Sequence, residues 1–410
     1  MNVTKTETHL MHLDDYVPLL GAPEIDELRS LAGHLSGRTV QMVNSTAMGG
    51  GVAEMLNRVV PLFQDLGLQP RWDVITGGQD FFEVTKAFHN ALHGGSYQAR
   101  KEDFDLFLAT NELNRQRLQF DCEFTVINDP QPLALVEARS KQEGHWIWRC
   151  HIDLSHPNPD VWSFLRPFVY RYDAALFSSA AFARQLPIPQ YLFYPCIDPL
   201  SEKNIDLDPE LVSSVLQGYG IDASRPIVTQ ISRFDRLKDP VGVVRAYQIV
   251  KRYTDCQLVL AGGSAADDPE GEIVLEEVRR EAKDDPDIHL LNLPPWSALE
   301  INALQRASTV IVQKSLREGF GLTVTEALWK KKPVVASAVG GIPAQVIHKH
   351  TGLLVHSIQG TAYQIRFLLS NPALAQKLGE QGHDHVREHF LITSNVRRYL
   401  TIFLHSLTHS

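Results

Sequence analysis

The sequence contains few cysteines, and none of them are paired in a motif. Its four cysteines, at positions 122, 150, 196 and 256, lie far apart and form no Cys-x-x-Cys pair. This spacing argues against a disulfide framework and against a zinc site built on cysteine pairs. We therefore expect free thiols and a cytoplasmic location.

The sequence also lacks long apolar runs and an excess of positive charge. No stretch approaches about 18 consecutive apolar residues, and the first residues form no apolar leader, so we expect neither a membrane-spanning helix nor a secretion signal. Lys and Arg number 39 against 48 Asp and Glu, which gives a net charge of -9. This balance argues against nucleic acid as a partner.

Length and composition instead favour two globular domains. The chain has 410 residues, of which 44% are hydrophobic and 21% charged. A domain usually has about 150 residues, so two or three domains are expected. The polar segment 201–209 is the best candidate for a linker, which predicts domains at 1–200 and 201–385 and a terminal helix at 386–410.

Short apolar runs alternate with amphipathic segments on both sides of this linker. Strands are predicted at residues 39–43, 71–75, 124–127, 145–156, 173–178, 227–231, 258–261, 288–291, 310–312 and 333–337, with helices at 52–66, 81–92, 241–251, 273–283 and 298–306. This alternation predicts an α/β protein with two Rossmann-like parallel-sheet domains facing a cleft. The segment 386–407 is predicted as one helix with no strand after it.

Two loops combine glycines with the start of a helix. The first strand is followed by Met48-Gly-Gly-Gly51, and the strand at 310–312 by Glu318-Gly-Phe-Gly321. A helix start carries unpaired N–H groups and a partial positive charge, which favour a phosphate. For the first loop, a tight strand-to-helix turn explains the glycines equally well.

Two carboxylates flank the second glycine turn. Glu318 follows a buried strand, where open α/β sheets bind ligands, although a solvated loop acid would also fit. Glu326 lies three residues after Thr323, a spacing typical of a capping box. The sequence therefore leaves two roles open for Glu326, a helix cap and a ligand contact.

Basic and imidazole side chains follow other predicted strands. Arg233 and Lys238 could neutralise a diphosphate, or form surface pairs with neighbouring aspartates. His151 and Asp153 would share one face if their strand continued to them. The histidine spacing suits no common metal site, and the aspartates at 103 and 105 are interpreted as a surface pair, so no metal is predicted.

The stretch from Glu318 to Glu326 resembles the E-x7-E motif of retaining glycosyltransferases of the GT-B fold, in glycosyltransferase family four. Arg233 and Lys238 match the basic pair of that family. The segments 48–54, 81–90, 148–153 and 313–329 are similar to trehalose synthases of the glycosyltransferring type. The resemblance covers nearly the whole chain, and it implies that the terminal helix crosses back to the first domain.

The resemblance also implies roles for individual residues. Glu318 would bind the donor glucose and Glu326 the ribose, while Arg233 and Lys238 would hold the diphosphate. His151 would lie near the anomeric carbon of the donor glucose, and Asp153 would lie on the acceptor side. Further donor-binding residues would be Gly50, Gly51, Gly319, Phe320, Gly321, Leu322 and Thr323. One departure from the family is that Ala344-Gln345 stands after the Gly-Gly-x-Pro turn, where many relatives carry an acid.

The activity implied is reversible, retaining transfer of glucose from a nucleoside-diphosphate glucose to glucose, which forms α,α-trehalose. No cofactor is required, with stimulation by Mg²⁺ left open, and the expected partners are these small molecules alone. A homodimer, the nucleotide base and the direction of flux also stay open. The alternatives are a trehalose phosphorylase that uses glucose 1-phosphate and a non-catalytic protein that binds nucleotide sugars.

Overall fold

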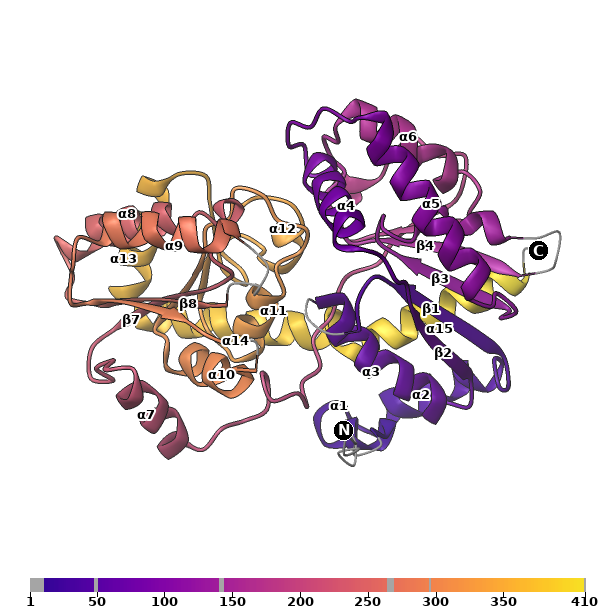
Figure 1. Cartoon of the computed structure of the whole chain (residues 1–410). Coiled ribbons are helices and arrows are strands. Elements are labelled where there is room, and N and C mark those ends of the chain that lie inside the picture. The colour runs from indigo at the N-terminus through magenta and orange to yellow at the C-terminus, as the bar shows by residue number, and fades with distance from the viewer. Residues whose placement is uncertain (1–10, 48–50, 140–143, 264–268, 295, 409–410) are drawn as a thin grey trace, which may run out of the picture. The chain divides into compact units, whose positions relative to one another are not determined.

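The chain forms two compact units and crosses between them twice. The computed structural model describes residues 11–47, 51–139, 144–263, 269–294 and 296–408 (Figure 1). The first unit comprises Met1–Tyr194 with Ile392–Ser410, and the second comprises Pro195–Leu391. The divisions thus fall near residues 194 and 391, whereas the sequence led us to expect them near 200 and 385.

The first unit contains a six-stranded parallel sheet. Its strands are β1 (Thr39–Asn44), β2 (Gln69–Val74), β3 (Phe124–Asn128), β4 (His145–Cys150), β5 (Ala174–Phe177) and β6 (Gln190–Leu192). Its α-helices are α1 (Val17–Leu20), α2 (Ala22–Gly33), α3 (Gly51–Asp65), α4 (Gln79–Leu92), α5 (Lys101–Arg117), α6 (Pro159–Val169) and α15 (Ile392–Thr408). The strand order is β2-β1-β3-β4-β5-β6, and every neighbouring pair is parallel.

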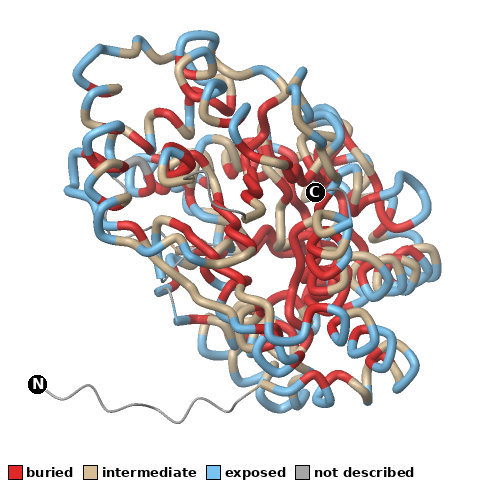
Figure 2. Tube along the Cα trace, turned by 90° about the vertical axis from the view of Figure 1, so that its right-hand side faces the viewer, coloured by how far each residue is buried: buried red, intermediate tan, exposed pale blue. Residues whose placement is uncertain are grey.

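Helices cover both faces of this sheet, as a parallel sheet requires. Helices α4, α5 and α6 pack together on one face, and α2, α3 and α15 on the other (Figure 1). Strands β1, β3, β4 and β5 are almost entirely buried, and Figure 2 shows the buried residues along the inner segments of the trace. On the α15 side, Phe124 of β3 stacks on Phe403 with ring centroids 4.4 Å apart. The last helix of the chain therefore completes the core of the first unit.

The second unit repeats this architecture. Its strands are β7 (Ile227–Ile231), β8 (Gln257–Gly262), β9 (Ile288–Asn292), β10 (Val310–Gln313), β11 (Val334–Ser337) and β12 (Leu353–Val355). Its α-helices are α7 (Pro209–Gly218), α8 (Pro240–Lys251), α9 (Pro269–Ala282), α10 (Ala298–Ala307), α11 (Leu322–Trp329), α12 (Ile342–Gln345), α13 (Ile358–Leu369) and α14 (Pro372–His389). The strands are again all parallel, in the order β12-β11-β10-β7-β8-β9.

Each strand order places a switch point in its sheet, where successive connections leave in opposite directions. The switch lies between β1 and β3 in the first unit and between β7 and β10 in the second. Ligands of open α/β sheets bind at the carboxyl ends of the strands beside such a point. The loops after these four strands are therefore the best candidates for ligand binding.

Two sequence predictions were wrong, one about a helix and one about the linker. The segment 386–407 is not one helix, because α14 ends at His389 and α15 begins at Ile392. The predicted linker at 201–209 lies within the second unit, where Asn302 of α10 donates to the carbonyl oxygens of Glu202 and Ile205 at 2.8 and 2.9 Å.

No helix in the described ranges is both long and apolar enough to cross a membrane.

Candidate active site

Two loops meet at the switch point of the second sheet. The loop after β7 carries Lys238 at the end of a short 3-10 helix, Arg236–Lys238, and the loop after β10 carries Glu318. The Lys238 Nζ lies 2.8 Å from Oε1 and 2.7 Å from Oε2 of Glu318. Two residues eighty positions apart, singled out from the sequence separately, are therefore in direct contact.

The contact holds Glu318 in a largely buried position. The Glu318 side chain is 8% exposed and that of Lys238 18%. The hydroxyl of Ser315 donates to Glu318 Oε2 at 3.0 Å. Because a carboxylate oxygen has further acceptor sites, Glu318 can accept hydrogen bonds from sugar hydroxyls while it keeps both partners.

Arg233 differs from Lys238 in its surroundings. Its side chain is 57% exposed, and its guanidinium lies 3.3 Å from Asp235. Asp239, the other aspartate considered as a surface partner, instead pairs with the buried Lys314 and caps α8 by accepting from the Gly242 N–H at 3.0 Å. The solvent-exposed face of Arg233 leaves most of its five N–H donors open to an anion.

Buried polar residues that the sequence did not reveal connect these two loops. Gln230, at the end of β7, donates from Nε2 to the Lys238 carbonyl oxygen at 3.1 Å and accepts from the Lys314 N–H at 3.1 Å. Leu316 N–H donates to the Leu237 carbonyl oxygen at 2.7 Å. No glycine or other motif in the loop after β7 marks Gln230 in the sequence. Only the fold shows that its side chain links the two loops.

The turn at Gly319–Gly321 is tightly packed against the second glycine turn, at Gly340 and Gly341. A Cβ on Gly340 would lie 1.6 Å from the Glu318 carbonyl oxygen, and one on Gly341 would lie 2.7 Å from that of Gly319. Phe320 is buried, and its carbonyl oxygen accepts from the amide of Gln345. Gln345, which departs from the family pattern, thus has a structural role next to the glycine turn.

The expected capping box at Thr323 and Glu326 is not present. Helix α11 begins at Leu322, with Gly321 as its N-cap at φ 86°, and no side chain caps it. Glycine adopts this left-handed conformation without the penalty of a Cβ atom. Thr323 therefore lies inside the helix, and Leu322 and Thr323 belong to the first turn, whose N–H groups lack intrahelical acceptors.

Glu326 is buried within the helix instead of acting as a cap. Its Oε2 lies 3.5 Å from the Gln305 side-chain amide. One turn later, Lys330 donates to the Glu326 carbonyl oxygen at 3.2 Å and to Asn204 at 3.0 Å. Burial lowers the pKa of Lys330 to about 7, and the charge of Glu326 opposes that shift. The capping role considered for Glu326 is therefore excluded.

The residues predicted in the first unit lie at the carboxyl edge of its sheet. Strand β4 ends at Cys150, so His151 and Asp153 do not share a strand face. Burial, with a smaller effect of Arg149, holds the pKa of His151 well below its ordinary value. Asp153 accepts from the Ser155 N–H at 2.8 Å within a turn. Gly51 is the first residue of α3, and Gly50 lies outside the described residues.

The sequence suggested that the aspartates at 103 and 105 form a surface pair, but this prediction was wrong. Asp103 is buried in α5 and accepts hydrogen bonds from Tyr97 at 2.6 Å and from Arg100 at 2.8 Å. Asp105 pairs with Lys101 at 2.5 Å. Both carboxylates thus have partners within their own helix region.

Comparisons with known proteins identify the family of the chain. Residues 42–184 match the family described as trehalose synthase, N-terminal domain, and residues 215–385 match glycosyl transferases group 1. A trehalose synthase of Thermococcus litoralis is 42% identical over 408 residues, which cover 98% of each chain. A trehalose phosphorylase of Pleurotus pulmonarius is 28% identical over 449 residues, covering 95% of this chain and 60% of the relative.

A solved structure shares the fold at lower sequence similarity. A sucrose-phosphate synthase from Thermosynechococcus elongatus is 18% identical and superposes with a TM-score of 0.71, covering 91% of this chain and 100% of that one. At this level of identity the match supports the fold alone. The prediction of two parallel-sheet units of the GT-B type is confirmed.

Proposed function

The chain belongs to the trehalose synthase family of glycosyl transferases, and from this premise we propose that it transfers glucose from a nucleoside-diphosphate glucose to free glucose. The product is α,α-trehalose, formed with retention in a reversible reaction. The chain is an enzyme of the glycosyltransferase type, and its relatives connect it to trehalose. The donor and the acceptor are the proposed part.

One observation carries this proposal: the contact between Lys238 and Glu318 at the switch point of the second sheet. A cation and a carboxylate in direct contact suit a donor substrate that carries both a negatively charged group and hydroxyl groups. The diphosphate needs positive charge, and the sugar hydroxyls need acceptors. A nucleoside-diphosphate sugar carries both groups side by side.

The proposed mechanism uses these charges on the leaving group. The bond between the anomeric carbon and the diphosphate oxygen breaks, and the acceptor hydroxyl oxygen bonds to the same face of that carbon. The hydroxyl proton passes to the departing diphosphate. Negative charge develops on the diphosphate in the transition state, so Arg233, Lys238 and the first N–H groups of α11 stabilise the transition state more than the bound donor.

Product analysis tests the proposal directly. The purified chain is incubated with glucose and each of a panel of nucleoside-diphosphate glucoses, and the release of nucleoside diphosphate and the linkage of the product by NMR are measured. We expect α,α-trehalose and stoichiometric nucleoside diphosphate from at least one donor. An α,β linkage, or transfer to another acceptor only, would refute the narrow assignment.

The similarity to a trehalose phosphorylase supports one alternative, phosphorolysis of trehalose to glucose 1-phosphate. The two reactions need different co-substrates for trehalose breakdown. The proposed transferase needs a nucleoside diphosphate, whereas a phosphorylase needs only inorganic phosphate. Breakdown with phosphate alone would therefore favour the alternative.

Arg233 provides a test at a single residue. Removal of one donor to a developing anion typically costs about 2.7 to 4 kcal/mol, so Arg233→Ala should lower turnover roughly 100-fold or more without unfolding the chain. The matched control is Arg236→Ala, three residues away, because Arg236 pairs with Glu277 at 2.7 Å and is equally exposed. Its turnover should stay near that of the unmodified enzyme. Equal losses in both variants would count against a diphosphate role for Arg233.

A further inference from the structure

A buried asparagine lies at the switch point of the first sheet. Asn128 is the last residue of β3 and is fully buried. Its Nδ2 donates to the carbonyl oxygen of Val43 in the neighbouring strand β1 at 3.1 Å. A carbonyl oxygen can only accept, so this bond fixes which end of the amide is the nitrogen. The Asn128 Oδ1 must therefore point away from β1.

The oxygen of this amide faces the imidazole of His151. The Asn128 Oδ1 lies 3.2 Å from His151 Nε2. An amide oxygen accepts hydrogen bonds and cannot donate them, so Nε2 must carry the proton. A neutral imidazole has one proton, which leaves Nδ1 as an acceptor. Burial and the nearby Arg149 both hold the pKa of His151 low, which keeps the ring neutral.

The backbone of His151 is fixed by a separate set of bonds. Asp129 has a left-handed conformation, with φ 64°. Its Oδ1 accepts from the His151 N–H at 3.0 Å, and its own N–H donates to the Arg149 carbonyl oxygen at 2.8 Å. The indole of Trp148 donates to the Asp129 carbonyl oxygen at 3.1 Å. Substitution of Asn128 can therefore change the protonation of the ring without releasing its backbone.

We propose that Asn128 is a positioning residue that holds His151 in the Nε2–H tautomer, so that His151 presents Nδ1 as an acceptor for a hydroxyl group. Within the described residues, His151 Nδ1 has no hydrogen-bond partner of its own. A bare ring nitrogen attracts the proton of a sugar hydroxyl and repels a phosphate oxygen. An acceptor of this kind therefore favours a sugar hydroxyl over a phosphate oxygen.

This inference rests on the proposed function only where it takes the hydroxyl group to belong to a sugar substrate. The tautomer itself follows from Val43, Asn128 and His151, whatever the substrate is. The charged groups known to act on this ring and its turn are Arg149 and Asp129. An experiment on the unliganded protein therefore separates failure of the tautomer from failure of the function.

The tautomer can be measured by NMR on the full chain labelled with ¹⁵N-histidine. Long-range ¹H–¹⁵N correlations distinguish the two tautomers and the protonated ring, and the His151 signals are identified by their absence in His151→Gln. We expect the Nε2–H pattern near neutral pH. In Asn128→Asp a carboxylate faces Nε2, so the ring should become protonated at the same pH. An Nδ1–H pattern or a charged ring in the unmodified protein would overturn the proposal.

Kinetics test whether the tautomer matters to catalysis. Residues that orient metal-binding histidines typically contribute about 10- to 100-fold, and by analogy we expect Asn128→Asp to lower kcat by about tenfold. Part of the loss should be recovered as the pH rises, because deprotonation restores a neutral ring. The control is Asn114→Asp in α5, another buried amide of the same unit, which bonds the Thr76 and Thr110 carbonyl oxygens at 2.7 and 2.8 Å.

The control separates positioning from stability. Asn114→Asp should lower the unfolding temperature without altering the His151 spectrum or the shape of the pH profile. If both variants change the pH profile equally, Asn128 is only structural and the proposal fails. If no donor yields trehalose with the unmodified enzyme, the proposed function fails, while the NMR measurement still decides the tautomer.

Discussion

At the scale of single residues, Lys238 and Glu318 combine a structural role with the proposed chemical one. Both are held at the switch point of the second sheet, and both side chains are largely removed from solvent. Taking either partner away leaves the other, largely desolvated charge without its ion-pair partner. Loss of activity in a single variant would therefore mix lost stability with lost substrate contacts.

A double-mutant cycle separates these two effects. We expect Lys238→Met and Glu318→Gln each to lower the free energy of unfolding by about 2 to 4 kcal/mol, less than for a fully buried pair because Lys238 is partly exposed. The double variant should be more stable than the sum of the single losses predicts, yet remain inactive. Urea unfolding and donor turnover measure the two quantities. Strict additivity in stability would show that the pair is not coupled.

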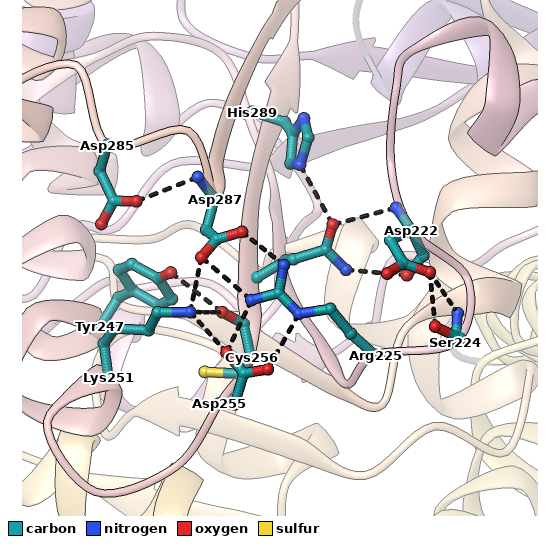
Figure 3. Close-up of polar contacts among 11 residues, drawn as sticks. Asp222, Ser224, Arg225, Tyr247, Lys251, Asp255, Cys256, Asp285, Asp287 and His289 are labelled. Atoms are coloured by element: carbon teal, nitrogen blue, oxygen red, sulfur yellow. Dashed lines mark hydrogen bonds and ion pairs between the residues drawn. The ribbon is translucent and has the colours of Figure 1, made fainter.

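At the scale of elements, an ion-pair network joins the segments that begin three strands of the second sheet. Arg225, before β7, binds Asp255, before β8, and Asp287, before β9 (Figure 3). Lys251, at the end of α8, pairs with the same two aspartates at 2.7 and 2.6 Å. Two cations and two carboxylates thus hold together the edge opposite to the candidate site.

This network makes a prediction about stability at low pH. The bonds from Arg225 and Lys251 lower the pKa of Asp287 below its ordinary 3.8. A lowered acid pKa stabilises the fold above the unfolded pKa, and this contribution is lost as the pH falls below it. Asp287→Asn should therefore destabilise the chain by roughly 1 to 2 kcal/mol near neutral pH, and the difference should shrink below about pH 4.

A surface pair in the same unit supplies the comparison for this measurement. Glu276 and Arg279 pair on the outside of α9 and are both more than half exposed. Glu276→Gln should change the free energy of unfolding by less than about 0.5 kcal/mol at any pH, because exposed pairs contribute little. Chemical unfolding over a pH series tests both variants. A constant difference for Asp287→Asn across that series would contradict the network's role.

Elements with strong local patterns could be predicted from the sequence, and those fixed by distant contacts could not. Strand β7 was predicted at its observed bounds, because a buried parallel strand appears as a continuous apolar run. Helix α5 was missed because its sequence has little amphipathic character and its charged residues obscure the buried face. The break between α14 and α15 has no proline or glycine, so local sequence gave no signal for it.

The candidate site shows the same limit. Glu318 and Lys238 could be selected because each follows a strand, but their contact depends on the strand order β10-β7, which local patterns do not specify. The bond from Asn128 to Val43 likewise joins residues 85 positions apart. The spacing of Glu326 to Thr323 left a helix cap and a ligand contact open, whereas the structure starts the helix at Leu322 and removes the first of these roles.

At the scale of the whole molecule, the chain passes between the units at two neighbouring points. In the second unit, Ile197 N–H donates to the Phe390 carbonyl oxygen at 2.9 Å, so the two connecting segments lie side by side. In the first unit, the Asn395 side chain donates to the Tyr194 carbonyl oxygen at 2.8 Å. Helix α15 is thus anchored in the first unit directly after the second crossing.

Arg149 is the main polar anchor of this helix. Its buried guanidinium lies 4.2 Å from the centre of the Phe193 ring and donates to the Tyr399 hydroxyl and, at 3.4 Å, to Asn395. Arg149→Met keeps an apolar side chain of similar length but removes these bonds. We expect faster hydrogen exchange along α15, with α14 in the second unit unchanged, since the helices belong to different units.

The control for this variant is an arginine over an aromatic ring in the other unit. Arg366 lies 3.9 Å from the centre of the Tyr253 ring, so Arg366→Met also removes a cation–π contact. Hydrogen exchange followed by mass spectrometry should show no change in α15 for Arg366→Met. If α15 exchanges equally in both variants, or stays unchanged in Arg149→Met, apolar packing such as that of Phe403 on Phe124 is sufficient to hold the helix, and Arg149 is not its anchor.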